Sequence, residues 1–138
     1  MKSQNYIDGQ WVGASDGKTF AQRNPADLEH VTGEWPQGTA AAAGQAIEAA
    51  HAAFPAWAEM GVYQRAEYLS RAVAVLKGRV EEIAAILTAE NGKTLDEART
   101  EVGSAVREME FQIAQGISMC GQTAPSAQAG VFAYSVRR

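Results

Sequence analysis

The strongest constraint on the fold is a helical stretch that begins at Thr94 and Glu97, a capping-box pair, and continues to Gly121. In a capping box each side chain accepts a hydrogen bond from a backbone N–H that the first helical turn leaves unpaired. The apolar residues that follow are spaced three or four apart: Val102, Val106, Met109, Ile113, Ile117 and Cys120. This spacing predicts one amphipathic helix of about seven turns, long enough to act as a structural spine.

Three shorter helices are predicted ahead of it, because apolar residues there also recur at a period near 3.6. The first is expected to begin at Thr39 and to end at Pro55, which has no backbone N–H. The second runs from Tyr63 to Gly78, and the third ends at Asn91-Gly92, a pair that tolerates the left-handed conformation. The faces expected to point inward are Ile47, Ala50 and Phe54; Leu69, Val73 and Leu76; and Val80, Ile83 and Leu87.

Residues 1–38 predict strands and loops. Asp8-Gly9 lies between Tyr6-Ile7 and Trp11-Val12, and this dipeptide favours the type I′ turn of a β-hairpin. Further turns or loops are expected at residues 15–18, at Asn24-Pro25 and at residues 33–38.

The last residues of the chain have the alternating pattern of an amphipathic strand. Phe132, Tyr134 and Val136 share one face of residues 131–137, which follow a loop at 121–130. Such a strand exposes backbone groups that need a partner, and no partner strand is obvious in the residues before it. We therefore predict an incomplete chain with an interface on this face. The partner is either a continuation of the chain, another subunit or the opening hairpin.

Composition excludes several classes of function. The 138 residues carry a formal net charge of −4, so the clustered Lys and Arg of a nucleic-acid site are not expected. No run approaches the roughly 20 apolar residues that span a bilayer, and the first residues lack the apolar core of a signal peptide. The single cysteine, Cys120, cannot form an intrachain disulfide. We expect a cytoplasmic protein that binds neither membrane nor nucleic acid.

The residues themselves contain no evident catalytic constellation. Cys120 would need a neighbouring base or positive charge to act as a nucleophile, but it closes the apolar stripe, so we expect a small buried hydrophobic residue. His30 and His51 are far apart in the sequence and do not complete a metal-ligand set. Neither phosphate-binding pattern, G-x-G-x-x-G or G-x-x-x-x-G-K-S/T, occurs. The prediction is a scaffold without a bound cofactor.

Three segments resemble the aldehyde dehydrogenase superfamily. The first is Ala53-Phe54-Pro55-Ala56-Trp57, at the end of an alanine-rich helix, and the second is Arg65-Ala66-Glu67-Tyr68-Leu69 in the next helix. The third and most specific is Glu90-Asn91-Gly92-Lys93-Thr94-Leu95-Asp96-Glu97-Ala98. Together with the opening Tyr6-Ile7-Asp8-Gly9-Gln10-Trp11-Val12 and the Asn24-Pro25 loop, the resemblance covers essentially the whole chain.

The resemblance implies an α/β parent enzyme with a Rossmann-type nucleotide-binding domain, of which this chain is the mostly α amino-terminal part. Residues 1–38 would supply a hairpin and loops, residues 39–121 four helices, and residues 122–138 a loop and a strand of the oligomerisation sheet. A homo-oligomer would form through that strand. The catalytic domain would be absent, because the family's next motif, Pro-x-Gly-Val, is not reached at Arg138.

For the parent enzyme the family implies oxidation of an aldehyde to an acid with NAD or NADP, through a cysteine thiolate and hydride transfer to nicotinamide. Those catalytic residues would lie beyond Arg138, so the chain alone is expected to be inactive. The segment looks most like dehydrogenases of carboxylated semialdehydes, such as ketoglutarate or succinate semialdehyde.

Two weaker implications of the resemblance concern residues of this chain. Glu90 would lie near a monovalent cation, with a plain surface carboxylate as the alternative. Ala105, Val106 and Met109 would line the aldehyde's access tunnel, with simple core packing as the alternative.

A free-standing helical module that pairs with itself or with a partner through its terminal strand is the competing hypothesis. It predicts a stable, concentration-dependent dimer. The dehydrogenase hypothesis instead predicts a polypeptide that continues with Pro-x-Gly-Val and a segment that is inert toward aldehydes by itself.

Overall fold

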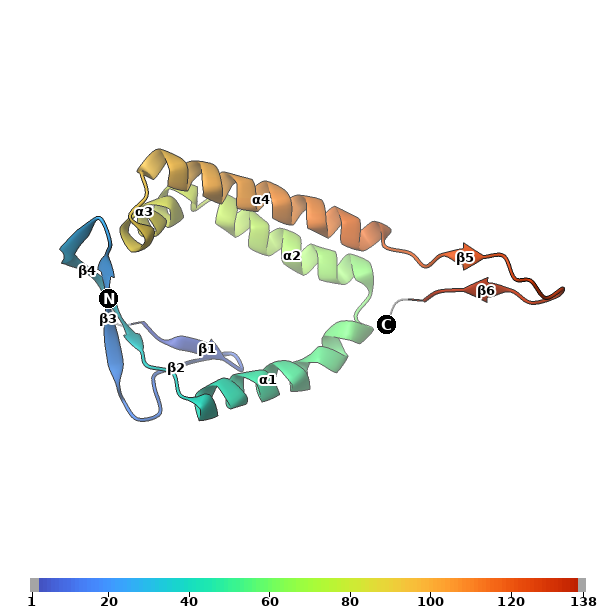
Figure 1. Cartoon of the computed structure of the whole chain (residues 1–138), viewed down its shortest axis with the longest axis horizontal. Helices are drawn as coiled ribbons and strands as arrows, with labels where there is room; N and C mark the ends of the chain where they lie inside the picture. Colours follow the sequence, from blue (N-terminus) through green and yellow to red (C-terminus); the bar gives the residue numbers. More distant parts are fainter. Residues whose placement is uncertain (1–2, 137–138) are drawn as a thin grey trace.

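The computed structural model describes residues 3–136 and is mostly helical (Figure 1). Within those residues, four helices follow two antiparallel strand pairs and precede a third pair. The helices are α1 (Ala40–Glu59), α2 (Val62–Lys77), α3 (Val80–Asn91) and α4 (Leu95–Ser118). The predicted four-helix segment with an opening hairpin is confirmed. In Figure 1, α2 and α4 lie side by side, α1 runs apart from them, and the last hairpin extends away from the helices.

The opening hairpin forms as the sequence predicts. β1 (Asn5–Ile7) pairs with β2 (Gln10–Val12), and Asp8 and Gly9 between them have φ values of 50° and 73°. Positive φ at both central residues is the signature of a type I′ turn, whose twist matches that of the strands it joins. The rings of the paired residues Tyr6 and Trp11 contact each other across the hairpin, with centroids 4.9 Å apart.

The predicted loop at residues 33–38 is wrong in its first part, because β4 (Asp27–Pro36) continues through it and pairs with β3 (Thr19–Asn24). Gly33 is buried in the middle of this pairing, and Pro36 lies opposite Thr19 at its end. Proline is tolerated at the end of a strand that has a neighbour on one side, because its missing N–H interrupts no continuous ladder. The turn that joins the strands contains Asn24-Pro25, as predicted.

Helix α1 begins where expected but ends later. The hydroxyl of Thr39 accepts a hydrogen bond from the N–H of Ala42 at 3.2 Å, which is the N-cap contact. The helix then continues past Pro55 to Glu59, so the predicted end is wrong. A proline removes the one hydrogen bond that its own N–H would donate, whereas the turns on either side still pair.

The predicted inward face of α1 is also wrong. Ile47 is 69% exposed, Phe54 is 59% exposed, and Ala50 is exposed as well. None of the residues of α1 is buried, because no other element described in the structure packs along the helix. A helical period identifies which residues share a face, but it does not supply the surface that covers them.

The core lies where α4 packs against α2 and α3. Its buried hydrophobic residues are Ala66, Val73, Ala84, Ala98, Val102 and Val106. Three partly buried residues of α3 pack against Ala84, Ala98 and Val102 and confirm the predicted inward face of α3: Val80, Ile83 and Leu87. All buried hydrophobic residues in the described range are alanines or valines. Much of the surface of the larger apolar side chains therefore stays exposed.

Helix α4 starts as predicted. The N–H of Glu97 donates to the hydroxyl of Thr94 at 3.3 Å, and the N–H of Thr94 donates to the carboxylate of Glu97 at 3.1 Å. The hydrogen bond from the Thr94 hydroxyl to the same carboxylate, followed by the bond from the N–H, lowers the pKa of Glu97 below its ordinary value. The capping box is therefore complete with an ionised glutamate.

The far end of α4 differs from the prediction. The helix ends at Ser118, and Met119 is already extended, with ψ 102°. Cys120 is exposed and lies outside the helix, so its expected place as a buried residue closing the apolar stripe is wrong. The predicted apolar stripe of α4 therefore extends beyond the part of the helix that packs against α2 and α3.

The terminal strand finds its partner within the stretch expected to be a loop. β5 (Thr123–Ala124) pairs with β6 (Ala133–Tyr134), so the opening hairpin is not its partner. At Gly121 the two chain segments approach so closely that a Cβ would lie 1.8 Å from the carbonyl oxygen of Ser135. We call residues 121–136 the β5–β6 arm. Strand β6 is shorter than the predicted strand of residues 131–137, and Arg137 lies outside the described residues.

Candidate functional site

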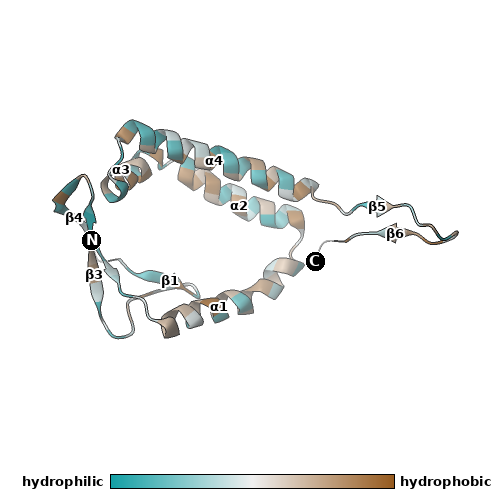
Figure 2. Ribbon diagram, viewed as in Figure 1, coloured by the Kyte–Doolittle hydropathy of each residue, from teal (hydrophilic) through white to brown (hydrophobic). Residues whose placement is uncertain are grey.

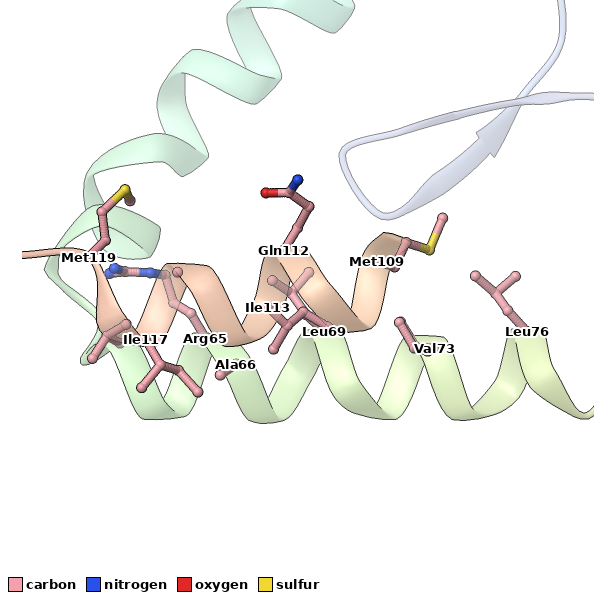
Figure 3. Close-up of a pocket in the computed structure, with 13 residues that line it drawn as sticks. Arg65, Ala66, Leu69, Val73, Leu76, Met109, Gln112, Ile113, Ile117 and Met119 are labelled. Carbon is pink, nitrogen blue, oxygen red and sulfur yellow. The ribbon is translucent and has the colours of Figure 1, made fainter. Parts of the chain in front are cut away.

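An apolar groove runs between α2 and α4, and we call it the α2–α4 groove. It has a volume of about 370 Å³. Figure 3 shows the side chains that form most of its walls: Leu69, Val73 and Leu76 from α2, and Met109, Ile113 and Ile117 from α4. These residues belong to the apolar stripes that the sequence places on the two helices, yet Leu69 is 44% exposed and Met109 is 42% exposed. The stripes are therefore only partly used by the contact between the two helices.

Two polar side chains line the groove, and both are engaged. Nη1 of Arg65 donates to the carbonyl oxygens of Trp57 and Ala58 at 3.5 and 3.3 Å and also to that of Met60. These carbonyls end α1 and lack partners within the helix, so Arg65 caps α1 and holds the corner between α1 and α2. The amide of Gln112 donates to the carboxylate of Glu108 at 2.7 Å along α4. The groove consequently presents an apolar surface suited to packing.

The sequence offered no hint that Arg65 caps the preceding helix. It appeared only as part of a family motif, and its contacts with the end of α1 depend on the corner between the two helices. The groove was likewise missed, because the sequence shows two apolar stripes but not how far apart their helices lie.

The cysteine and the two histidines considered as candidate catalytic residues lie on separate parts of the structure. Cys120 is exposed beyond the end of α4, His51 is exposed on α1, and His30 is exposed on β4. Across residues 3–136, no three His, Cys, Asp or Glu side chains come together where they could hold a metal ion. The same part of the chain has no helix with both the length and the apolar character that crossing a bilayer requires.

Several acidic residues of α3 and α4 form surface ion pairs. Glu82 lies 2.6 Å from the guanidinium of Arg79, and the hydrogen bond between them lowers the pKa of the glutamate and raises that of the arginine. Other exposed pairs join Glu81 with Arg99, and Glu110 with Lys77. Such exposed ion pairs contribute little to the stability of the fold.

Glu90 is half-buried in the last turn of α3. Gly92 then ends the helix with φ 78°, and it approaches the turn between β3 and β4 so closely that a Cβ would lie 2.8 Å from Cγ of Pro25. The Glu-Asn-Gly-Lys and Asn-Pro motifs, far apart in the sequence, therefore meet in space. A monovalent cation near Glu90 stays a prediction.

The three residues predicted to line an access tunnel, Ala105, Val106 and Met109, all border one small hollow between α3 and α4. Val106 is buried in the core, Ala105 is exposed, and Met109 lies at the end of the α2–α4 groove. Leu76 and Leu87 border the same small hollow. The structure thus brings the three residues together, and their role in an aldehyde tunnel stays a prediction.

The predicted interface residues are on the β5–β6 arm. Phe132, Tyr134 and Val136 are 72%, 65% and 65% exposed, and the rings of Phe132 and Tyr134 lie 5.7 Å apart. The arm projects from the end of α4 away from the core (Figure 1). An exposed two-stranded hairpin of this size is marginally stable by itself, so the arm is suited to pairing with a further surface.

A comparison with known proteins identifies the family of this framework. The model of the aldehyde dehydrogenase family matches residues 11–138. The chain belongs to the aldehyde dehydrogenase family. The resemblance of its three motifs is thereby confirmed.

Two relatives and one solved structure show how much of an aldehyde dehydrogenase is present. The 3-sulfolactaldehyde dehydrogenase of Pseudomonas putida is 39% identical over 129 residues, which is 94% of this chain and 26% of that protein. The α-ketoglutaric semialdehyde dehydrogenase of Bacillus subtilis strain 168 is 32% identical, over 96% of this chain and 27% of that protein. A crystal structure of an NAD-dependent aldehyde dehydrogenase from Sinorhizobium meliloti is 29% identical, with a TM-score of 0.87, over 93% of this chain and 26% of that one.

The chain therefore spans about a quarter of the length of the aldehyde dehydrogenases that it matches. Its open arrangement, with α1 apart from α2 and α4, is also the backbone arrangement of this region in a complete subunit.

Proposed function

We propose that this chain is the amino-terminal framework of an NAD- or NADP-dependent aldehyde dehydrogenase and is inactive by itself. One observation carries the proposal: a solved subunit superposes on 93% of this chain with a TM-score of 0.87, but the chain spans only 26% of that subunit. The single cysteine, Cys120, is exposed beyond the end of α4, and the two histidines lie on β4 and α1, whereas oxidation of an aldehyde through a thioester requires a thiolate beside a base.

We further propose that the complete enzyme oxidises an aldehyde bearing a second, anionic group, such as a dicarboxylic semialdehyde. Support comes from the two relatives described above, named for 3-sulfolactaldehyde and α-ketoglutaric semialdehyde. In the reaction the aldehyde and water yield the acid and release one proton, while NAD⁺ or NADP⁺ accepts the hydride and becomes NADH or NADPH. Equal kcat/KM values for a semialdehyde and an uncharged aldehyde of the same length would contradict this choice of substrate.

The isolated chain, with its composition verified by intact mass, is expected to form no NADH or NADPH from succinate semialdehyde above the uncatalysed rate. We also consider a chimera, in which Arg138 of this chain is joined to the part of the P. putida relative that lies outside the matched region. The chimera is expected to be active, because it then has the missing catalytic groups. The absorbance of the reduced nicotinamide measures both. Turnover by the isolated chain, or a folded but inert chimera, would contradict the proposed function.

The β5–β6 arm is proposed to mediate homo-oligomerisation. Its support is the exposure of Phe132 and Tyr134 on a hairpin that projects from the helices. We expect Tyr134→Pro to weaken self-association at least tenfold, because proline removes a backbone donor and distorts β6. Ala129→Pro, in the exposed turn of the arm, is the control and should leave association unchanged. Sedimentation velocity over a range of concentrations measures the self-association of both variants. Equal association of Tyr134→Pro and Ala129→Pro would refute the role of the arm.

A self-association module without catalytic activity is the second candidate function, and the same exposed arm favours it. It would replace the first proposal if the isolated chain formed a stable dimer through the arm and the chimera, although folded, did not oxidise aldehydes.

A monovalent cation is proposed to bind beside Glu90, near the meeting point of Gly92 and Pro25. Potassium chloride should then raise the melting temperature of the chimera more than tetramethylammonium chloride of equal ionic strength, because a ligand that binds the folded state stabilises it. Glu90→Gln should remove the difference, whereas Glu67→Gln, on exposed α2, should keep it. Identical melting curves in the two salts would rule the cation out.

We also propose a cytoplasmic location, supported by the single unpaired, exposed cysteine. Recovery of the complete protein from a periplasmic or secreted fraction would contradict it.

A further inference from the structure

Asn91 and Gly92 form a dipeptide that is prone to a spontaneous backbone reaction. The chain has three asparagines, which precede a tyrosine, a proline and, for Asn91, a glycine. Asparagine is thermolabile because the backbone nitrogen that follows it can attack its side-chain amide. A proline nitrogen has no hydrogen to lose, and a tyrosine side chain hinders the approach, whereas glycine has no Cβ to obstruct it. Asn91 is therefore the asparagine of this chain best suited to deamidation.

The reaction needs no partner other than water. The nitrogen of Gly92 bonds to Cγ of Asn91, and the bond from Cγ to Nδ2 breaks. The hydrogen of the Gly92 nitrogen leaves with the amide group as ammonia, and a succinimide ring remains in the backbone. Water then opens the ring at either carbonyl. The product is an aspartate, or an isoaspartate whose backbone runs through the side-chain methylene and is one atom longer.

The folded structure holds the attacking nitrogen in place. Asn91 is exposed as the last residue of α3, so water reaches its amide. The N–H of Gly92, however, donates to the carbonyl oxygen of Thr88 at 2.8 Å, which is the bond that closes the last turn of α3. Ring closure requires this hydrogen bond to break and Asn91 to leave the helical conformation. The reaction therefore proceeds from a locally opened state of the helix end.

A second contact resists that opening. A Cβ on Gly92 would lie 2.8 Å from Cγ of Pro25 and 3.2 Å from the backbone nitrogen of Ala26, so the end of α3 lies closely against the β3–β4 turn. In Figure 2, α3 lies beside one end of the β3–β4 pair, at the edge of the molecule. Opening of the last turn of α3 thus also requires the loss of the contact between Gly92 and Pro25.

We propose that Asn91 is a site of spontaneous deamidation, closed while Gly92 is docked on the β3–β4 turn and open when that contact is lost. Both products prevent a return to the original contact. Isoaspartate lengthens the backbone where Gly92 has no room to move. Aspartate adds a negative charge at the carboxyl end of α3, where the helix dipole disfavours it. The site depends on this chain alone and is independent of the proposed function.

The test follows this chain in mildly alkaline buffer, with and without urea, by mass spectrometry of its peptides. We expect the Asn91 amide to be lost at least about tenfold more slowly in the folded chain than in urea, because only the opened helix end reacts. Pro25→Ala removes the ring atoms that Gly92 contacts, so it should accelerate the loss in the folded chain at least about threefold with unchanged helical circular dichroism. Pro125→Ala, the same change on the exposed arm, is the control and should leave the rate unchanged.

Amide hydrogen exchange of the wild-type chain provides a measurement that needs no variant. The N–H of Gly92 should exchange more slowly than that of Gly130, which also has a positive φ but lies in the exposed turn of the arm. Equal exchange at the two glycines would overturn the proposal. Equal loss of the Asn91 amide in the folded and the unfolded chain would do the same, as would a folded Pro25→Ala variant that reacts no faster than the wild type. Faster deamidation of another asparagine in urea would assign the reaction elsewhere.

The consequence of the reaction is measured on aged protein. Wild-type chain in which most of Asn91 has reacted should unfold at a lower urea concentration than fresh chain. Asn91→Gln should unfold at the same concentration before and after ageing, because its longer side chain closes the corresponding ring much more slowly. An unchanged unfolding midpoint of the deamidated wild type would refute the permanent loss of the contact.

Discussion

Replacement of Gly92 by alanine is expected to lower the free energy of unfolding by about 2 to 5 kcal/mol. Two costs add at this position. An alanine in the left-handed conformation, which Gly92 adopts with φ 78°, is strained. Its Cβ would also lie 2.8 Å from Cγ of Pro25 and 3.2 Å from the backbone nitrogen of Ala26, so α3 and the β3–β4 turn would be forced apart. The measurement is urea unfolding followed by circular dichroism.

Gly44→Ala is the matched control for that substitution. Gly44 lies inside α1, with nothing within 4 Å of the position of an added Cβ. Alanine is the better helix former there, so the control should stabilise α1 by roughly 0.5 to 1 kcal/mol. If Gly92→Ala proved as stable as the wild type, the close packing of the two motif regions would be refuted.

Replacement of Ala84 by leucine is expected to lower the free energy of unfolding by about 1 to 3 kcal/mol. Ala84 is fully buried in α3 and forms one cluster with Ala98, also fully buried, and Val102. A larger side chain would push α3 away from α4, because both helices present small residues where they meet. Thermal unfolding of the chain provides the measurement.

The neighbouring Ala85→Leu substitution makes the same chemical change on the exposed side of α3. It should alter the free energy of unfolding by no more than about 0.5 kcal/mol, because surface substitutions away from special features are nearly neutral. Equal losses from the two substitutions would show that the close contact of α3 with α4 does not contribute to stability.

The candidate site was only partly predictable from the sequence. The family motifs identified the parent enzyme, and the apolar faces of α2 and α4 were assigned residue by residue. That Gly92 lies against Pro25 and Ala26 was not visible, because the two segments are brought together by the contact of α3 with β3. Arg65 as a cap for α1 and the groove itself also required the relative placement of helices.

The sequence alone determined the features that depend on a few neighbouring residues. The capping box at Thr94 and Glu97, the type I′ turn at Asp8-Gly9 and the left-handed helix end at Gly92 follow from local conformational preferences and short-range hydrogen bonds.

Only the tertiary structure decided what covers each apolar face and which strands pair. The face of α1 points to no described element, β4 extends through Pro36, and Thr123 pairs with Tyr134 in what looked like a loop. The physical reason is that a periodic pattern specifies which residues share a face. The burial of that face, by contrast, depends on surfaces that are distant in the sequence.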